Sequence, residues 1–135
     1  MIIKSIAHTA YRCSDMEKSL DFYCNVLGLS RVFDLSHGDK PWIIYLKVCG
    51  GQFIELFYTG PEETVEQANS ASYTHLCLEV FDIHEACESI KSKGYPLTSE
   101  PVQGIDLNMQ AWVADPDGNR IELMQINENS PQAKA

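Results

Sequence analysis

The feature that most constrains this chain is an internal repeat with an offset of 67 residues. When the sequence is shifted by that offset, GQFIEL falls on GNRIEL and His8 falls on His75. Glu55 follows His8 by 47 residues, and Glu122 follows His75 by the same interval. A repeat of this kind predicts two copies of one supersecondary unit that share a hydrophobic core.

Each half of the sequence predicts the order strand, helix, strand, strand, strand, which makes the fold class α+β. Ser14 with Glu17 is typical of a helix N-cap, Asp82 begins a second copy of that signal, and Gly28 and Gly94 are placed to end the two helices. The predicted strands are residues 3–11, 29–35, 41–48 and 52–58 in the first half, and 74–80, 96–100, 107–114 and 119–126 in the second.

These patterns divide the chain into two βαβββ modules within a single domain. Residues 1–60 form the first module and residues 73–126 form the second. Between them, residues 61–72 are polar and acidic and are expected to be a linker. Residues 127–135 are polar and are expected to be a disordered tail.

Charge and cysteine content exclude several classes of partner. The 135 residues include 19 acidic and 10 basic side chains, for a formal charge of −9, so binding to nucleic acid or to an anionic membrane is not expected. The five cysteines are odd in number and form no CxxC motif, which argues against a disulfide framework or a zinc-thiolate cluster. Reduced thiols, with no apparent signal peptide, favour a cytoplasmic location.

Alternation along the predicted strands places one histidine and one glutamate of each half on the sheet face away from the helix. These are His8 and Glu55 in the first half and His75 and Glu122 in the second; Arg12 has the same parity as His8. Two imidazoles and two carboxylates are suitable ligands for a divalent first-row metal. The repeat therefore predicts one metal site with two ligands from each module.

The stretches HTAYRCSDMEKSLDFYCNVLGL, FIELFY, THLCLEV and DPDGNRIELMQI resemble the vicinal oxygen chelate (VOC) superfamily, with the closest likeness to glyoxalase I (lactoylglutathione lyase). The likeness covers about residues 3–126 and implies curved mixed sheets around a cavity. It implies metal ligands at His8, Glu55, His75 and Glu122. It further implies nickel or zinc as the metal, with cobalt, manganese or iron as alternatives, and a cytoplasmic homodimer.

The resemblance also implies a reaction, the conversion of the hemithioacetal of an α-ketoaldehyde such as methylglyoxal to a thioester through a metal-stabilised enediolate. Glu122 would be the principal base and Glu55 a second one, with Arg12 contacting a glutathione or other thiol adduct. Two substrate-binding positions depart from the family pattern. Thr59 stands where glyoxalase I has an asparagine, and Asn108 where some members have a basic residue.

Other functions fit the same architecture. An acyl-CoA epimerase would share the metal site, and an extradiol dioxygenase would use His8, His75 and Glu122 with iron. A metal-free protein that binds a drug would need none of these ligands. The sequence leaves open which metal is bound, what the natural substrate is, and whether the modules pair within one chain or across a dimer.

Overall fold

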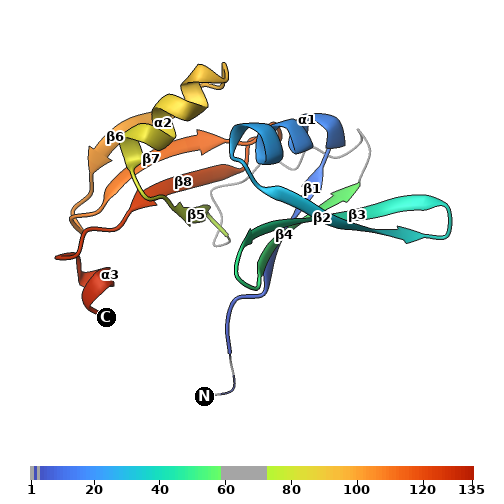
Figure 1. Ribbon diagram of the computed structural model, residues 1–135, viewed down its shortest axis with the longest axis horizontal. Coiled ribbons are helices and arrows are strands. Elements are labelled where there is room, and N and C mark those ends of the chain that lie inside the picture. The colour runs from blue at the N-terminus through green and yellow to red at the C-terminus, as the bar shows by residue number, and fades with distance from the viewer. Residues whose placement is uncertain (1, 3, 59–72) are drawn as a thin grey trace. The chain divides into compact units, whose positions relative to one another are not determined.

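A computed structural model describes residue 2, residues 4–58 and residues 73–135 (Figure 1). The chain divides into two compact units, residues 1–66 and residues 67–135. Each unit contains one four-stranded mixed sheet with helical structure packed on one face.

The two units have the same order of elements. In the first unit this order is β1 (His8–Cys13), α1 (Met16–Leu20), the π-helix η1 (Asp21–Val26), β2 (Ser30–His37), β3 (Lys40–Cys49) and β4 (Gln52–Tyr58). In the second it is β5 (Leu76–Glu79), α2 (Ile83–Ser92), β6 (Ser99–Gln103), β7 (Met109–Ala114), β8 (Arg120–Gln125) and α3 (Pro131–Lys134). The sheets are ordered β1-β4-β3-β2 and β5-β8-β7-β6, which confirms the predicted βαβββ repeat.

The core of the first unit lies between its sheet and the segment formed by α1 and η1. Phe22 and Tyr23 of η1 are fully buried. The buried hydrophobic side chains of the strands belong to the parity that faces the helix or to the centre of β3: Tyr11, Cys13, Ile43, Ile44, Leu46, Ile54 and Leu56. The opposite face of β1 and β4 therefore carries His8, Arg12 and Glu55, as strand alternation predicts.

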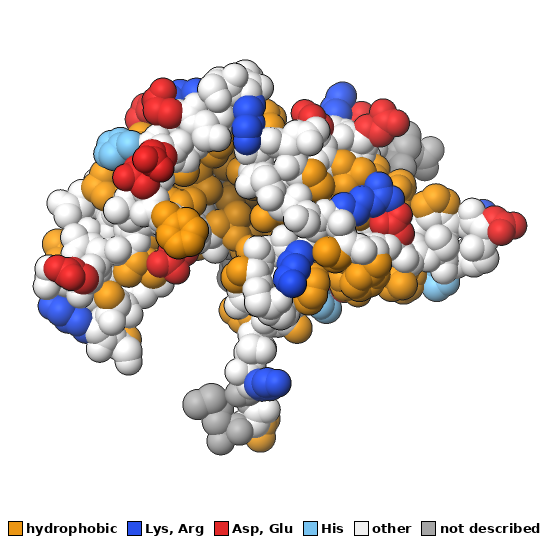
Figure 2. Space-filling view, viewed as in Figure 1, with side chains coloured by type: hydrophobic (Ala, Val, Ile, Leu, Met, Phe, Trp, Pro, Cys, Tyr) orange, Lys and Arg blue, Asp and Glu red, His pale blue; other side chains and the backbone are white. Residues whose placement is uncertain are grey.

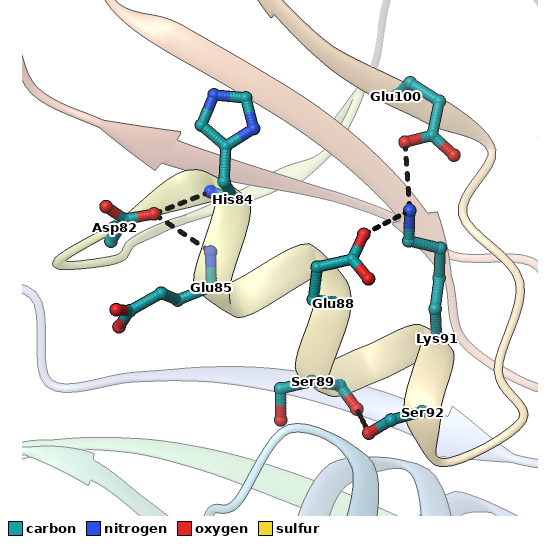
Figure 3. Close-up of polar contacts among 8 residues, drawn as sticks. All are labelled: Asp82, His84, Glu85, Glu88, Ser89, Lys91, Ser92 and Glu100. Atoms are coloured by element: carbon teal, nitrogen blue, oxygen red, sulfur yellow. Dashed lines mark hydrogen bonds and ion pairs between the residues drawn. The ribbon is translucent and has the colours of Figure 1, made fainter.

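The second unit repeats this arrangement with α2 on its sheet. The Asp82 carboxylate accepts hydrogen bonds from the backbone N–H groups of His84 (2.8 Å) and Glu85 (2.9 Å), which caps the helix (Figure 3). Lys91 Nζ lies 2.6 Å from Glu88 Oε1 and 3.4 Å from Glu100 Oε2, so one ammonium joins α2 to the strand β6 (Figure 3).

The first helix begins one residue later than predicted. Asp15, not Ser14, is its N-cap: the backbone of Asp15 is extended, and its Oδ1 accepts from the N–H of Lys18 at 3.2 Å. Either side chain can cap a helix, and spacing to Glu17 favoured the wrong one. The predicted ends are confirmed, because Gly28 and Gly94 have φ values of 82° and 77° that favour glycine.

The C-terminal residues also differ from the expected disordered tail. Pro131–Lys134 form the short helix α3, and Ser130 is its buried N-cap, with Oγ accepting from Ala133 N–H at 3.1 Å. The Ser-Pro pair is a helix-start signal that a reading of polarity alone overlooks. Among the helices of residues 4–58 and 73–135, none is long and apolar enough to cross a bilayer.

Candidate functional site

The first unit brings His8 and Glu55 together on the face opposite its helix. β1 runs parallel to β4, and Ala10 lies opposite Glu55 in the register. His8 precedes Ala10 by two residues, so its side chain lies on the same face of the sheet as Glu55. His8 Nδ1 is 3.5 Å from Glu55 Oε1. The glutamate side chain is only 7% exposed, whereas the imidazole is 48% exposed. A carboxylate is therefore held at the sheet surface with its histidine partner still open to a ligand.

A tyrosine also contacts the Glu55 carboxylate. Tyr45 of β3 lies opposite Glu55 in the antiparallel register. A hydrogen bond from the Tyr45 hydroxyl to Glu55, together with desolvation and the negative charge of the carboxylate, raises the pKa of Tyr45. The phenol thus acts as a donor that satisfies a buried acceptor, and it adds a second partner to His8.

The second unit repeats the pairing with a shorter distance. His75 immediately precedes β5, and its Nε2 lies 3.0 Å from Glu122 Oε2 on β8. The glutamate side chain is again 7% exposed. Thr74 Oγ1 lies 2.9 Å from His75 Nδ1, so the two ring nitrogens have different partners. This second contact orients the imidazole towards Glu122.

Two further side chains of the second unit lie around this pair. Trp112 is opposite Glu122 in the β7–β8 register, and its ring meets the His75 ring edge to face with centroids 4.8 Å apart. Cys77 is opposite Glu122 on the other side, from β5. The Cys77 side chain reaches solvent, yet desolvation of the sulfur and the adjacent Glu122 charge raise its pKa to about 12. Cys77 is therefore a neutral thiol beside the carboxylate at neutral pH.

The sequence of the chain matches a known family over nearly its whole length. The profile of the Glyoxalase/Bleomycin resistance protein/Dioxygenase superfamily matches residues 5–123. The chain belongs to this superfamily. A probable lactoylglutathione lyase of Vibrio cholerae serotype O1 is 35% identical over 126 residues, which cover 89% of this chain and 89% of that protein.

Solved structures of other proteins share the fold of this chain. A lactoylglutathione lyase from Agrobacterium tumefaciens superposes with a TM-score of 0.70 at 21% identity, covering 93% of this chain and 96% of that one. An antibiotic binding protein from Streptomyces sp. CB03234 superposes with a TM-score of 0.71 at 23% identity, covering 94% and 99%. The fold thus occurs in proteins with an enzyme's name and in proteins named for binding.

The remaining predicted site residues of this superfamily member have different surroundings. Arg12 is exposed on the same face as His8, and no carboxylate of residues 4–58 or 73–135 lies within ion-pair distance of its guanidinium. Thr59 lies outside the described residues. Asn108 immediately precedes β7 and is fully buried.

The buried carboxamide of Asn108 contacts only other parts of the protein. Its Nδ2 donates to Asp106 Oδ2 (2.9 Å) and to Gln132 Oε1 of α3 (3.2 Å), and its Oδ1 accepts from the backbone N–H of Asn127 (2.9 Å). These contacts give Asn108 a structural role at the C-terminus and leave the prediction that it binds substrate without support.

The metal site remains a prediction at this point. In the part of the chain that the structure describes, no group of three or more His, Cys, Asp and Glu side chains is gathered closely enough to hold an ion. Each unit supplies one imidazole nitrogen and one carboxylate, which is half of the predicted ligand set. Two such halves would give the mixed nitrogen and oxygen donors that zinc and nickel accept.

The two histidines and two glutamates that strand parity assigned to one face lie in two pairs, and each pair has an aromatic neighbour. The contacts of Tyr45 with Glu55 and of Trp112 with His75 depend on cross-strand register. In the first unit, rings of Phe33 and Tyr45 stack with centroids 4.2 Å apart, and Tyr45 meets Phe53 at 6.3 Å. Hydrophobic side chains are also exposed along β2 and β3 (Figure 2): Val32, Phe33, Leu35 and Trp42.

Proposed function

We propose that this chain is a metal-dependent lyase of the glyoxalase I type, which converts the hemithioacetal of an α-ketoaldehyde such as methylglyoxal to a thioester. The observation that carries the proposal is the repeated pair of a histidine and a buried glutamate, His8 with Glu55 and His75 with Glu122. Buried carboxylates in strands are costly unless they are paired or coordinated. Relatives named lactoylglutathione lyase support the same class of reaction.

His8, Glu55, His75 and Glu122 would hold one divalent metal ion, nickel or zinc in the first instance. Nitrogen and carboxylate donors suit both metals, and the imidazoles of His8 and His75, 48% and 31% exposed, leave each pair accessible. We further propose that the chain acts as a cytoplasmic homodimer, in which each pair meets the other pair either within one chain or across the dimer. When bound, such an ion would polarise the substrate oxygens and make the adjacent C–H more acidic.

The protein's own residues would then move the proton. Glu122 would remove the proton from the carbon that carries the hydroxyl and the sulfur and return it to the neighbouring carbonyl carbon. The hydroxyl proton would pass to the former carbonyl oxygen, so that the net reaction is an isomerisation. Glu55 occupies the equivalent position in the first unit and would act as ligand and second base. Arg12, exposed on the same face of β1 as His8, would bind a carboxylate of the thiol adduct.

The replacement Glu122→Gln tests this assignment, because it keeps the size and one oxygen of the side chain but removes the base. We expect turnover of the methylglyoxal–glutathione hemithioacetal to fall by about a hundredfold or more. Metal content, measured by mass spectrometry of the purified protein, should stay close to one ion per site.

Glu79→Gln is the matched control, since Glu79 lies on the same face of β5 as Cys77 and is exposed. This variant should keep full activity. Turnover by Glu122→Gln at the rate of the unmodified protein would contradict the role proposed for Glu122.

A ligand-binding protein without metal chemistry is the second candidate. It is favoured by one observation, the row of aromatic rings Phe33, Tyr45 and Phe53 on the same sheet face as Glu55, which could stack on a flat molecule. Metal analysis of the purified protein separates the two functions. A protein that takes up no nickel, zinc or cobalt and turns over no hemithioacetal would be assigned to the binding class.

A further inference from the structure

The second unit places a cation on the same sheet face as Glu122. Arg120 precedes Glu122 by two residues on β8, so the two side chains share a face. The guanidinium carbon of Arg120 lies 4.4 Å from the centroid of the Trp112 ring. The same ring meets His75 at 4.8 Å. One indole therefore contacts both a predicted metal ligand and an arginine.

The charge of Arg120 is not neutralised by a neighbour in the described structure. Of the three arginines, Arg31 is paired with Asp34, whereas Arg120 has no carboxylate of residues 4–58 or 73–135 within ion-pair distance. The side chain is exposed at the first position of β8. In a chain with a formal charge of −9, an unpaired guanidinium on this face is a local attraction for an anion.

Stacking prepares the guanidinium to bind an anion. The ring attracts the flat face of the cation and restricts its motion, while the N–H groups at its edge remain directed away from the ring. Those N–H groups match the two oxygens of a carboxylate. An anion bound there would lie close to His75, where the proposed chemistry occurs, without competing for the Glu122 carboxylate.

We propose that Arg120 is a specificity-determining residue that binds a carboxylate on the thiol part of the substrate, and that Trp112 positions it. This inference rests on the proposed function, because the thiol adduct is the substrate of that reaction, and it adds a residue of the second unit that recognises the carboxylate. Arg120 would be a second cation for the substrate, in addition to Arg12 of the other unit. Trp112 would hold the Arg120 guanidinium in position, a role that its partial burial alone does not explain.

The test compares two hemithioacetals of methylglyoxal, one made with glutathione and one with the neutral thiol N-acetylcysteamine. Arg120→Gln should raise KM for the glutathione adduct about tenfold or more, the loss expected for one charge-assisted hydrogen-bonded pair. It should leave kcat for both adducts, and KM for the neutral adduct, within twofold of the unmodified enzyme. Lys93→Gln, which removes the same charge from the end of α2 on the helical side of the sheet, should change neither.

Trp112 is tested through its effect on Arg120. Trp112→Leu should raise KM for the glutathione adduct as Arg120→Gln does, and the double variant should be no worse than either single one. Trp112→Phe keeps an aromatic face and should restore most of the loss. Equal effects of Arg120→Gln on both adducts, or additive effects of the two replacements, would overturn the proposal.

Calorimetric binding separates this inference from the proposed function. The probes are S-hexylglutathione and its diester, which lacks free carboxylates. If the unmodified protein turns over neither adduct but binds S-hexylglutathione, and Arg120→Gln weakens that binding tenfold without affecting the diester, the inference stands and the lyase proposal fails. If Arg120→Gln binds S-hexylglutathione as tightly as the unmodified protein does, the inference fails whatever the activity.

Discussion

Asn108 should be one of the most sensitive positions for stability in the second unit. Its side chain is fully buried. It makes a long contact with Met124 Sδ (3.5 Å) and three hydrogen bonds of 2.9 to 3.2 Å, to Asp106, Gln132 and the backbone of Asn127. These partners belong to the hairpin between β6 and β7 and to the C-terminal segment that ends in α3. Removal of the carboxamide would release both segments at once.

The expected cost follows from the number and kind of these bonds. A hydrogen bond between neutral groups contributes roughly 0.5–1.5 kcal/mol net, and one to a charged carboxylate roughly 1.5–3 kcal/mol. Two bonds of the first kind and one of the second predict that Asn108→Ala lowers the free energy of unfolding by about 4 kcal/mol. That is a large part of the ~5–15 kcal/mol that holds a typical domain folded.

Urea unfolding followed by circular dichroism measures this loss, and two further variants interpret it. Asn129→Ala makes the same change at an exposed residue of the same segment and should cost less than about 0.5 kcal/mol. Asn108→Asp keeps the shape but replaces the NH2 donor by a carboxylate facing Asp106, so it should be destabilising at neutral pH without leaving a cavity. An Asn108→Ala protein as stable as Asn129→Ala would refute the structural role of the carboxamide.

Three further predictions concern other parts of the chain. Ser19 is fully buried, and its Oγ has no hydrogen-bond partner in the described structure. Ser19→Ala should therefore leave the free energy of unfolding in urea unchanged or raise it. A fall in that free energy by more than about 1 kcal/mol would show that the hydroxyl has a partner. Asp82→Ala removes two capping hydrogen bonds from α2 and should cost about 1 kcal/mol, whereas the same loss in Glu85→Gln would argue against a capping effect. The pKa of Cys77 is raised from 9.0 to about 12. In the metal-free protein, alkylation of this thiol by iodoacetamide should therefore stay slow up to pH 10. The protonated thiol's contribution to the free energy of unfolding should be complete below pH 9 and be lost towards pH 12. Glu122→Gln should speed that alkylation, and an unchanged rate would show that Glu122 does not raise the pKa of the thiol.

Strand alternation and the repeat were sufficient to predict most of the fold and the two His–Glu pairs. A period of two assigns faces without any knowledge of tertiary contacts, so Ile54 and Leu56 were expected to be buried against the helix and Glu55 to lie on the other face. The same rule holds for Ile121, Leu123 and Glu122. Because the offset preserves residue type and parity together, the second unit needed no separate argument.

The features that sequence reasoning missed depend on contacts between segments. The family pattern predicted that Asn108 binds substrate. Its carboxamide instead donates a hydrogen bond to Gln132 of α3, a helix that polarity alone did not predict. The contact of Trp112 with Arg120 requires the register of β7 against β8, where Ala114 lies opposite Arg120. Neither the hairpin length nor the bulges that set a register can be read from hydrophobic alternation.

The two units have the same residue types at the His–Glu pair but differ in which ring nitrogen of the histidine faces the glutamate. His75 presents Nε2 to Glu122 because Thr74 contacts Nδ1, whereas His8 presents Nδ1 to Glu55. In both pairs an imidazole nitrogen lies within 3.5 Å of an oxygen of a nearly buried carboxylate, so each glutamate has a polar partner inside its own unit. A nitrogen that ligates a metal must offer a lone pair. Metal binding at these pairs would therefore replace the contact of each imidazole nitrogen with its own glutamate by a bond from that nitrogen to the ion.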